Sequence, residues 1–482
     1  MAPSTEIISI DNQLIPPLLQ TEKDEIEEGR KVDHIIDLND LDNLYIKSWT
    51  ISKVNVWLRE SNPDAYTPKM VSIGPYHKKN PQLDSMEKYK KLYLRRFLQR
   101  KEGLDVKSCI SEMVKLKKEA LECYDDMKDI DTKMLLLDGC FVVEFIREHS
   151  REHSPKGEDK IININNNYIR PRGHVFNLWK SGMRGKAMYN KPLRSVPSPN
   201  PAHSGSFSAS GCSFYISRDL LLLENQLPFF VLDQLFLMTK QDDDEPLEKL
   251  VSHWFHSFVH FPITTECKAG NIKHLLHLLH IFSCHGITKE KSNDYKTMEM
   301  VMPNATELSE AGVSFAKVSN MTSSFDIKFE NGLMTIPCFR VEDDTETILR
   351  NLIAYEQQSS DEHSTYFSDY ATFMDHLIDS DKDVNLLRKK GIIVNWLGED
   401  KEVASLFNKI GKGVTLYHDG FYYNKQFRKA VEHCKKPWNR MKANLKHNYF
   451  SSPWVGASTV AAIILLILTT IQTILAFTGS VM

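Results

Sequence analysis

The sequence predicts a mainly α-helical protein: a large helical globular domain with a small β-hairpin at about 325–341 and one C-terminal transmembrane helix. Three observations lead to this prediction. The stretch from Ile216 to Met238 is apolar at nearly every position, which is typical of buried helices. An Asn-Gly pair, the preferred two-residue turn, lies between two short hydrophobic runs. Val455 to Phe477 contains no charged residue over 23 positions, enough to cross a bilayer.

The composition is that of a globular protein without a surplus of positive charge. The 482 residues are 41% hydrophobic and 26% charged, and 60 Lys and Arg stand against 63 Asp and Glu. The net charge of −3 argues against nucleic acid as a partner, because such binders carry a basic surplus. The eight cysteines form no CxxC pair, and a chain of this length needs no disulfide framework. We therefore expect reduced thiols in a protein that faces the cytosol.

Residues 1 to about 40 form an acidic segment that we expect to be disordered. Met1 to Arg30 has no basic region followed by an apolar run, which excludes a secretory signal, and it is too acidic for an Arg-rich transit peptide. The helical domain is expected to extend from residue 41 to about residue 450.

A loop and then a basic helix follow Tyr66. Ser72 to Tyr76 has turn composition, and a helix is expected to start near Asp84 or Ser85. Its apolar positions face a core, while Lys and Arg gather on the other side. We interpret that side as a solvated face; the alternative is a contact with acidic lipid or with a partner.

Met134 to Ile146 predicts a second buried helix, the natural packing partner of Ile216 to Met238. Asp138 and Glu144 are its only charges. Buried carboxylates can perform acid–base chemistry because burial raises their pKa. More often they close a structural network with an arginine or a backbone amide, which is the role expected here.

The region at about 150–211 resembles an insertion of low complexity. It contains an immediate repeat of Arg-Glu-His-Ser, a run of Asn, and a final part rich in Ser, Pro and Gly. Such composition cannot bury enough apolar surface to fold alone.

Pro228 interrupts the apolar stretch, because proline cannot donate a backbone hydrogen bond. We therefore predict two helices, with Asn225 capping the second and Pro228 in its first turn. Glu224, Asn225 and Gln226 would lie at a buried joint, where each polar group must find a partner. The structural signature expected at this joint comprises Arg218, Asp219, Glu224, Asn225, Gln226, Pro228 and Phe229.

A histidine-rich helix is the candidate metal site. His274, His277, His280 and Cys284 fall on one helical face, and His with Cys is ordinary zinc chemistry. One straight helix cannot surround a tetrahedral ion, however, and the adjoining stripe is made of leucines. We interpret the histidines as the polar, solvent-facing side of an amphipathic helix and expect no metal.

The clearest β signal surrounds Asn331-Gly332. A two-residue turn there makes one face of the hairpin wholly apolar. Pro337 would suit an edge strand. The predicted register pairs Phe329 with Met334, Lys328 with Thr335, Ile327 with Ile336 and Phe325 with Cys338.

Helices are expected next at about 368–379, 382–390 and 400–410. Gly391 and Gly411 mark two of their ends. No Walker-type phosphate loop, HExxH, GxSxG or kinase motif occurs, and no cofactor or small-molecule ligand is indicated. A site built from Asp138, Glu144 and Glu224 is the enzymatic alternative.

The C-terminal segment divides into a juxtamembrane stretch at 451–454, the span at 455–477 and a tail at 478–482. Basic residues crowd its near side: Lys435, Lys436, Arg440, Lys442 and Lys446. They place the large domain in the cytosol, at the plasma membrane or an endomembrane, with insertion as a tail-anchored protein. Sequons at Asn304 and Asn320 would require a lumenal domain, so we expect both to remain unmodified.

Several motifs resemble the plant domain-of-unknown-function 247 family. They are YTPKMVSIGPYHKKN from Tyr66, RDLLLLENQLPFF from Arg218 and CKKPWNRMKANLKHNYFSSPW from Cys434. The resemblance covers roughly residues 40–150 and 212–477. It implies a mainly helical, plant-restricted, single-pass membrane protein with no established biochemical activity. Some grass members are associated with pollen-side self-incompatibility, which implies a recognition or signalling role with an unidentified protein partner.

Overall fold

The computed structural model confirms a mainly helical protein. It describes residues 50–150, 210–259, 261–263, 271–287, 301–318, 323–359, 365–415, 420–449 and 453–479. The predicted acidic segment at 1–40, nearly all of the predicted insertion and Asn320 lie outside these ranges.

The N-terminal half is a group of helices around one buried helix, α6 (Thr132–Ser150). Around α6 lie α4 (Glu87–Leu98), α5 (Val106–Glu122), α9 (Phe229–Met238) and α10 (Leu247–Phe258). This half also contains α3 (Val56–Arg59), the 3-10 helices η1 (Pro63–Tyr66) and η2 (Pro81–Met86), α8 (Ser210–Asp219) and α11 (Leu275–Cys284).

The expected pairing of the two apolar stretches is confirmed. At Gly139 of α6, an added Cβ would overlap the side chain of Leu235 in α9, so the two helices approach closely because glycine lacks that atom. The helix expected from Asp84 or Ser85 begins as η2 and becomes α-helical at Glu87.

The C-terminal half combines helices with short strands. Its helices are α12 (Ala305–Glu310), α13 (Thr345–Gln358), α14 (Tyr366–Leu377), α15 (Asp381–Lys389), α16 (Asp400–Ile410), α17 (Asn424–Lys435), α18 (Pro437–Tyr449) and α19 (Pro453–Gly479). Helices α14, α15 and α16 confirm the three predicted at about 368–379, 382–390 and 400–410.

The hairpin is confirmed at its turn and corrected at its ends. Strands β2 (Lys328–Glu330) and β3 (Leu333–Ile336) pair antiparallel, with Phe329 opposite Met334. Asn331 and Gly332 both have positive φ, 50° and 79°, as this tight turn requires.

The predicted pairing of Phe325 with Cys338 is wrong, because β3 ends at Ile336, before Pro337. The prediction of an edge strand there is also wrong. Strand β1 (Ser314–Lys317) pairs in parallel with β3, which makes β3 the central strand. The chain beyond Pro337 forms β4 (Phe339–Val341), which pairs in parallel with β5 (Ile393–Asn395).

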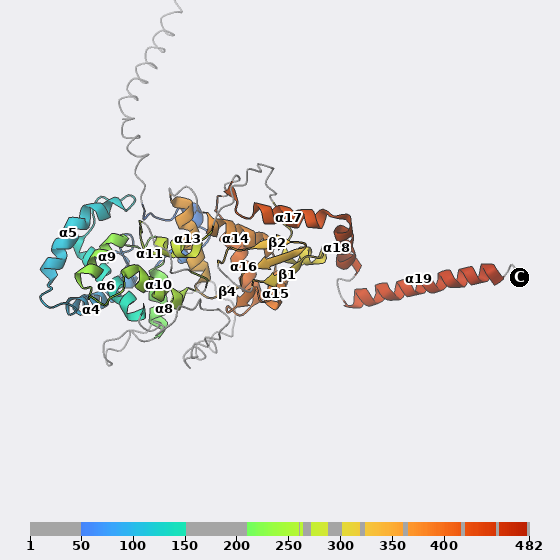
Figure 1. The fold of residues 1–482 in the computed structure, drawn as a ribbon, viewed down its shortest axis with the longest axis horizontal. Coiled ribbons are helices and arrows are strands. Elements are labelled where there is room, and N and C mark those ends of the chain that lie inside the picture. Colours follow the sequence, from blue (N-terminus) through green and yellow to red (C-terminus); the bar gives the residue numbers. More distant parts are fainter. Residues whose placement is uncertain are drawn as a thin grey trace, which may run out of the picture.

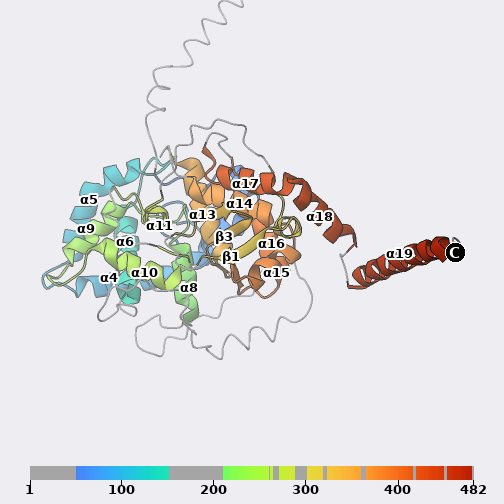
Figure 2. The same cartoon turned by 45° about the vertical axis from the view of Figure 1, so that its right-hand side comes forward.

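One continuous hydrophobic cluster runs from Ile51 to Ala430 and joins the two halves into a single head. Helix α13 lies between the halves and contacts both η1 and α11 (Figures 1 and 2). Helix α19 extends away from the head in both views.

Candidate functional site

The signature residues occupy a buried joint between α8 and α9. The chain from Leu220 to Pro228 passes through the interior without forming a helix or strand, and every residue in it is buried. Backbone groups in such a place need partners from elsewhere. Gln226 Nε2 donates to the carbonyl oxygens of Leu220 and Leu222 at 2.8 Å each, and its Oε1 accepts from Leu276. Asn351 Oδ1 accepts from Leu223 N at 2.9 Å.

Asp219 forms the first link between the two signature motifs. Its carboxylate accepts hydrogen bonds from three consecutive amides, those of Lys69, Met70 and Val71, at distances from 2.6 to 3.0 Å. Arg218 NH1 also donates to Asp219, at 2.8 Å. Burial raises the pKa of Asp219, while the Arg218 guanidinium and the amides act in the opposite direction.

Asn225 and Asp138 continue the link along the same loop. Asn225 Oδ1 accepts from Ile73 N at 2.7 Å, and its Nδ2 donates to Val71 O at 3.0 Å. Asp138 Oδ2 accepts from Gly74 N at 3.0 Å. Side chains therefore bind the backbone of the loop from Lys69 to Gly74, which is exposed at Lys69 and buried from Val71 onward, much as neighbouring strands bind a strand.

The prediction that Asn225 caps the second helix is wrong. Helix α9 begins at Phe229, with Pro228 at the N-cap position and not in the first turn. The Asn225 side chain is occupied by the loop at 71–73. The first amide of α9, that of Phe229, donates instead to Lys273 O at 2.8 Å.

Glu224 closes the outer side of the joint. It contacts Arg59 NH2 at 2.5 Å and His77 Nε2 at 3.1 Å, and it accepts from Val54 N at 2.6 Å. Burial alone would raise the pKa of Glu224, but His77, Arg59 and the Val54 amide hold it below its usual value.

The other two candidate carboxylates are ion-paired in separate places. Asp138 lies 2.7 Å from Lys90 Nζ. Complete burial raises the pKa of Asp138 to about 6, although the Lys90 ammonium opposes this effect. Glu144 binds Arg100 Nε at 2.5 Å and Arg147 NH1 at 3.1 Å.

The histidines of α11 are not solvent-facing, so that prediction is wrong. They are buried because α13 covers them, and the Tyr355 ring lies 5.4 to 5.5 Å from the rings of His274, His277 and His280. His274 is the N-cap of α11: its Nδ1 accepts from His277 N at 3.2 Å, and its Nε2 bonds Thr50 O at 3.0 Å.

His280 and Cys284 belong to a network that joins α11 to α14. His280 Nε2 lies 2.9 Å from Glu356 Oε1 and 3.7 Å from Cys284 Sγ. Glu356 also accepts from the Phe367 and Ser368 amides in the first turn of α14. Both the carboxylate and the thiol use the same ring nitrogen, so the arrangement is not a nucleophile–base–orienter triad. Within the described ranges, no group of three or more His, Cys, Asp or Glu side chains has metal-binding geometry.

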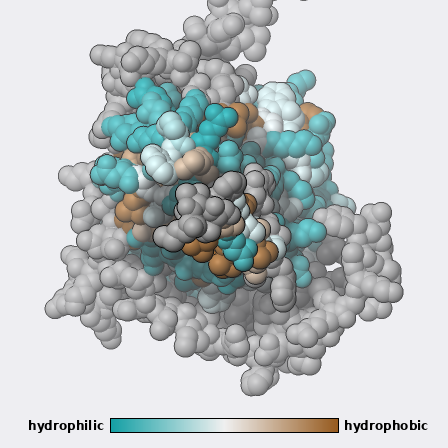
Figure 3. Space-filling view, turned by 90° about the vertical axis from the view of Figure 1, so that its right-hand side faces the viewer, coloured by the Kyte–Doolittle hydropathy of each residue, from teal (hydrophilic) through white to brown (hydrophobic). Residues whose placement is uncertain are grey.

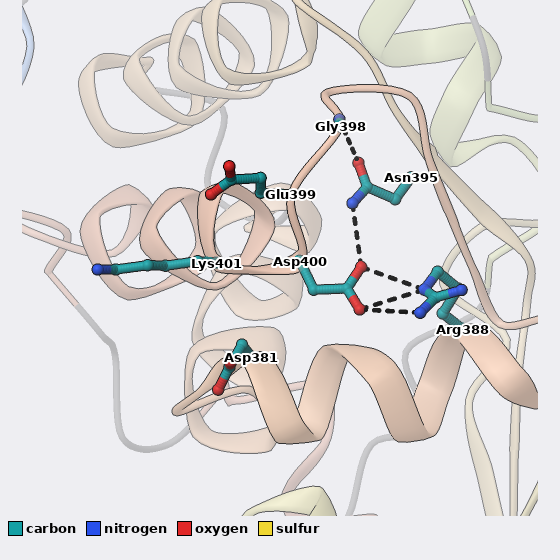
Figure 4. A pocket seen from close by; sticks show the side chains of 7 residues that line it. All are labelled: Asp381, Arg388, Asn395, Gly398, Glu399, Asp400 and Lys401. Atoms are coloured by element: carbon teal, nitrogen blue, oxygen red, sulfur yellow. Dashed lines mark hydrogen bonds and ion pairs between the residues drawn. The ribbon is translucent and has the colours of Figure 1, made fainter. Parts of the chain in front are cut away.

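A shallow surface hollow of about 540 Å³ lies where α15 meets the start of α16 (Figure 4). Arg388 and Asp400 bind each other there, with Nε to Oδ1 at 3.1 Å, and Asn395 Nδ2 donates to Asp400 at 3.1 Å. Asp381, Glu399 and Lys401 point in different directions (Figure 4). Arg388 and Asp400 therefore neutralise each other, and the charged side chains of the hollow do not converge on a common point.

Comparison with known proteins identifies the family. Residues 51–468 match the DUF247 family, described as plant protein of unknown function. The chain belongs to this family.

Two relatives from Arabidopsis thaliana match most of the chain. UPF0481 protein At3g47200 is 26% identical, over 86% of this chain and 83% of its own length. UPF0481 protein At3g02645 is 22% identical, over 93% of each. No solved structure matches.

The DUF247 match runs into α19, the helix that is long and apolar enough to span a membrane. Ala457–Ala476 has a mean hydropathy of 2.3, and none of it is buried against the head. Figure 3 views the molecule from the side on which α19 projects, so this helix points toward the viewer, and hydrophobic residues lie near the middle of the view.

Most of the residues that bind the buried joint were not predicted from the sequence. Lys90, Asn351 and the amides at 69–71 belong to the joint, yet they lie far from Asp219 and Glu224 along the chain. The motif YTPKMVSIGPY was visible, but nothing in it indicated that its backbone binds RDLLLLENQLPFF.

Proposed function

We propose that this DUF247 protein is a membrane-tethered interaction module, anchored by α19, whose head binds a protein partner in the cytosol at the plasma membrane or an endomembrane. The observation that supports the anchor is α19 itself. Twenty residues rise about 30 Å, the thickness of a hydrocarbon core. Their apolar side chains are exposed in the isolated chain, and a bilayer would remove that surface from water.

The basic flank supports a cytosolic head. Lys and Arg residues concentrate between Lys435 and Lys446, on the side of α19 that leads to the head, with no Asp or Glu among them. An excess of such residues remains cytoplasmic during membrane insertion.

The burial and pairing of the three candidate carboxylates support an interaction role over an enzymatic one. Asp138, Glu144 and Glu224 are each buried and paired with a cation, in separate networks. An enzyme would need at least some of them to face a cleft that admits substrate. Neither the hollow beside α15 and α16 nor the small one beside Asp344 is lined by any of the three.

Glycan mapping of the full chain in plant cells tests the orientation. A cytosolic head leaves Asn304 and Asn320 bare, so endoglycosidase causes no mass shift. A shift that disappears in the Asn304→Gln/Asn320→Gln variant would place the head in the lumen and overturn the orientation. A matched control carries a new sequon after Gly479, which acquires a glycan if α19 spans with the head in the cytosol.

Proximity labelling tests the interaction role. A ligase fused to the N-terminus of the full chain is compared with the same ligase fused to residues 453–482 alone. Both fusions carry the same anchor and label proteins at the same membrane. Proteins that are enriched only by the full-chain fusion are therefore neighbours of the head. We expect a small reproducible set that binds the purified full chain directly. Identical labelling by the two fusions would contradict the proposal.

A further inference from the structure

Helix α18, next to the membrane segment, presents both basic and apolar side chains to solvent. Between Lys435 and Lys446 the chain carries five Lys or Arg residues and no Asp or Glu. Trp438 is 77% exposed and Met441 is 53% exposed. They are three residues apart, so they share one side of the helix.

Three of these five cations are not neutralised by the described part of the head. Lys436, Arg440 and Lys442 form no ion pair with a carboxylate of the described chain. Lys442 Nζ rests against backbone, 3.2 Å from where a Cβ on Gly312 would lie. Buried cations of the head, such as Lys90 and Arg147, are by contrast paired with carboxylates.

The position of α18 is fixed on two sides. It contacts α12 and α17 of the head, and residues 450–452 connect it to α19. Four Cα steps reach at most about 14 Å, so the end of α18 must lie close to the start of the span. When α19 crosses a bilayer, α18 therefore lies at or near the headgroup layer.

We propose that α18, together with Lys436 just before it, binds lipid, and that the exposed side chains of Lys436, Trp438, Arg440, Met441 and Lys442 lie among the headgroups of an anionic leaflet. The inference rests on the proposed function, because α19 must span a membrane. It adds the chemistry of the ligand, anionic phospholipid, and a fixed orientation of the head against the bilayer.

Two physical properties select this ligand. Cytoplasmic leaflets are negatively charged and attract juxtamembrane Lys and Arg within a Debye length. Tryptophan prefers the interface, where its ring is apolar and its N–H remains hydrogen-bonded. An acidic protein would satisfy the cations but gives no reason for the adjacent membrane segment, so it is the alternative outcome of the test.

Quenching of Trp438 by brominated lipids tests the inference. The full chain is placed in nanodiscs of phosphatidylcholine, with or without phosphatidylserine, and the Trp438 signal is the difference between wild type and Trp438→Phe. We expect quenching of this signal to increase roughly twofold or more with phosphatidylserine. The Lys436→Gln/Arg440→Gln/Lys442→Gln variant should lose the dependence on phosphatidylserine.

Trp396 provides the matched control. It is 54% exposed but lies on the head beside Arg340, so its signal, measured with Trp396→Phe, should not be quenched in either lipid. Equal quenching of Trp438 in both lipids, or none, would overturn the inference and leave the face to a protein partner. Carbonate extraction distinguishes failure of the lipid-contact inference from failure of the proposed membrane anchor. A chain that stays in the membrane after extraction but shows no Trp438 quenching is anchored without the lipid contact.

Discussion

Asp219 satisfies three consecutive backbone amides, a task that a neighbouring strand usually performs. Asn225, Gln226 and Asn351 similarly bind backbone groups of segments that form no sheet. The signature side chains therefore supply the backbone hydrogen bonds that secondary structure would otherwise provide in the interior. Mutation of these side chains should destabilise the fold before it changes any surface property.

Gly74 lies where the loop backbone packs closely against the backbone of Gln226. Its φ is +74°, and a Cβ there would lie 2.6 Å from Gln226 O. Gly74→Ala should lower the free energy of unfolding by about 3 kcal/mol or more, because overlap adds to the strain of about 1–3 kcal/mol for such a φ. Gly103 has a φ of +78° with nothing within 4 Å, so Gly103→Ala should cost only the strain. Chemical denaturation of the full chain in detergent micelles measures both; equal losses would contradict the predicted overlap.

His274 should make the stability depend on pH. Burial, followed by the neighbouring His277, lowers the pKa of His274 well below 6.5 in the folded protein. The unfolded chain therefore binds a proton first as pH falls below 6.5, and the free energy of unfolding decreases by up to about 1.4 kcal/mol per pH unit.

The variant His274→Asn isolates this effect. Asparagine keeps a side-chain acceptor for His277 N but cannot titrate. Denaturation between pH 7 and 5 should give a smaller slope for the variant than for wild type. Parallel slopes would show that His274 is protonated as easily in the folded state as in the unfolded state.

At the scale of elements, the contact between α6 and α9 organises the N-terminal half. Leu235 of α9 is fully buried against Gly139, whereas Leu237 of the same helix is 50% exposed. Leu235→Ala should cost about 2–5 kcal/mol because it leaves a cavity. Leu237→Ala should cost less than about 1 kcal/mol, because little surface is buried there. Thermal melts of the two variants provide the comparison; similar melting temperatures would place the core elsewhere.

At the scale of the whole molecule, Arg350 of α13 ties the two halves together. It is 2% exposed and donates to Ser61 Oγ at 2.6 Å and to Lys409 O at 2.9 Å, while Nε binds Glu346 at 2.8 Å. Arg350→Met should lower the free energy of unfolding by about 1.5–3 kcal/mol, because it removes the hydrogen bonds that a buried guanidinium makes to both halves.

Arg388→Met is the matched control for this prediction. Arg388 binds Asp400 at the surface, with its side chain 46% exposed, so the loss should stay below about 1 kcal/mol. Denaturation of both variants measures the difference. Equal losses would mean that the halves are held by the shared hydrophobic cluster alone.

The sequence by itself determined the features that depend on neighbours along the chain. Helices α14 to α16, the Asn331-Gly332 turn with its Phe329–Met334 register, and the long apolar helix α19 all follow from periodicity, turn chemistry or uninterrupted apolar length. Each is a local property, because the groups that decide it lie within a few turns of one another.

Only the tertiary structure decided the features that depend on distant segments. Asp219 accepts from amides about 150 residues earlier, and β4 pairs with β5 although three helices, α13 to α15, lie between them in the chain. The histidines of α11 are buried because α13 covers them, although their spacing predicts a polar face. A buried polar side chain must find some partner, but its own sequence neighbourhood does not say which backbone will supply it, since many loops offer the same amides and carbonyls.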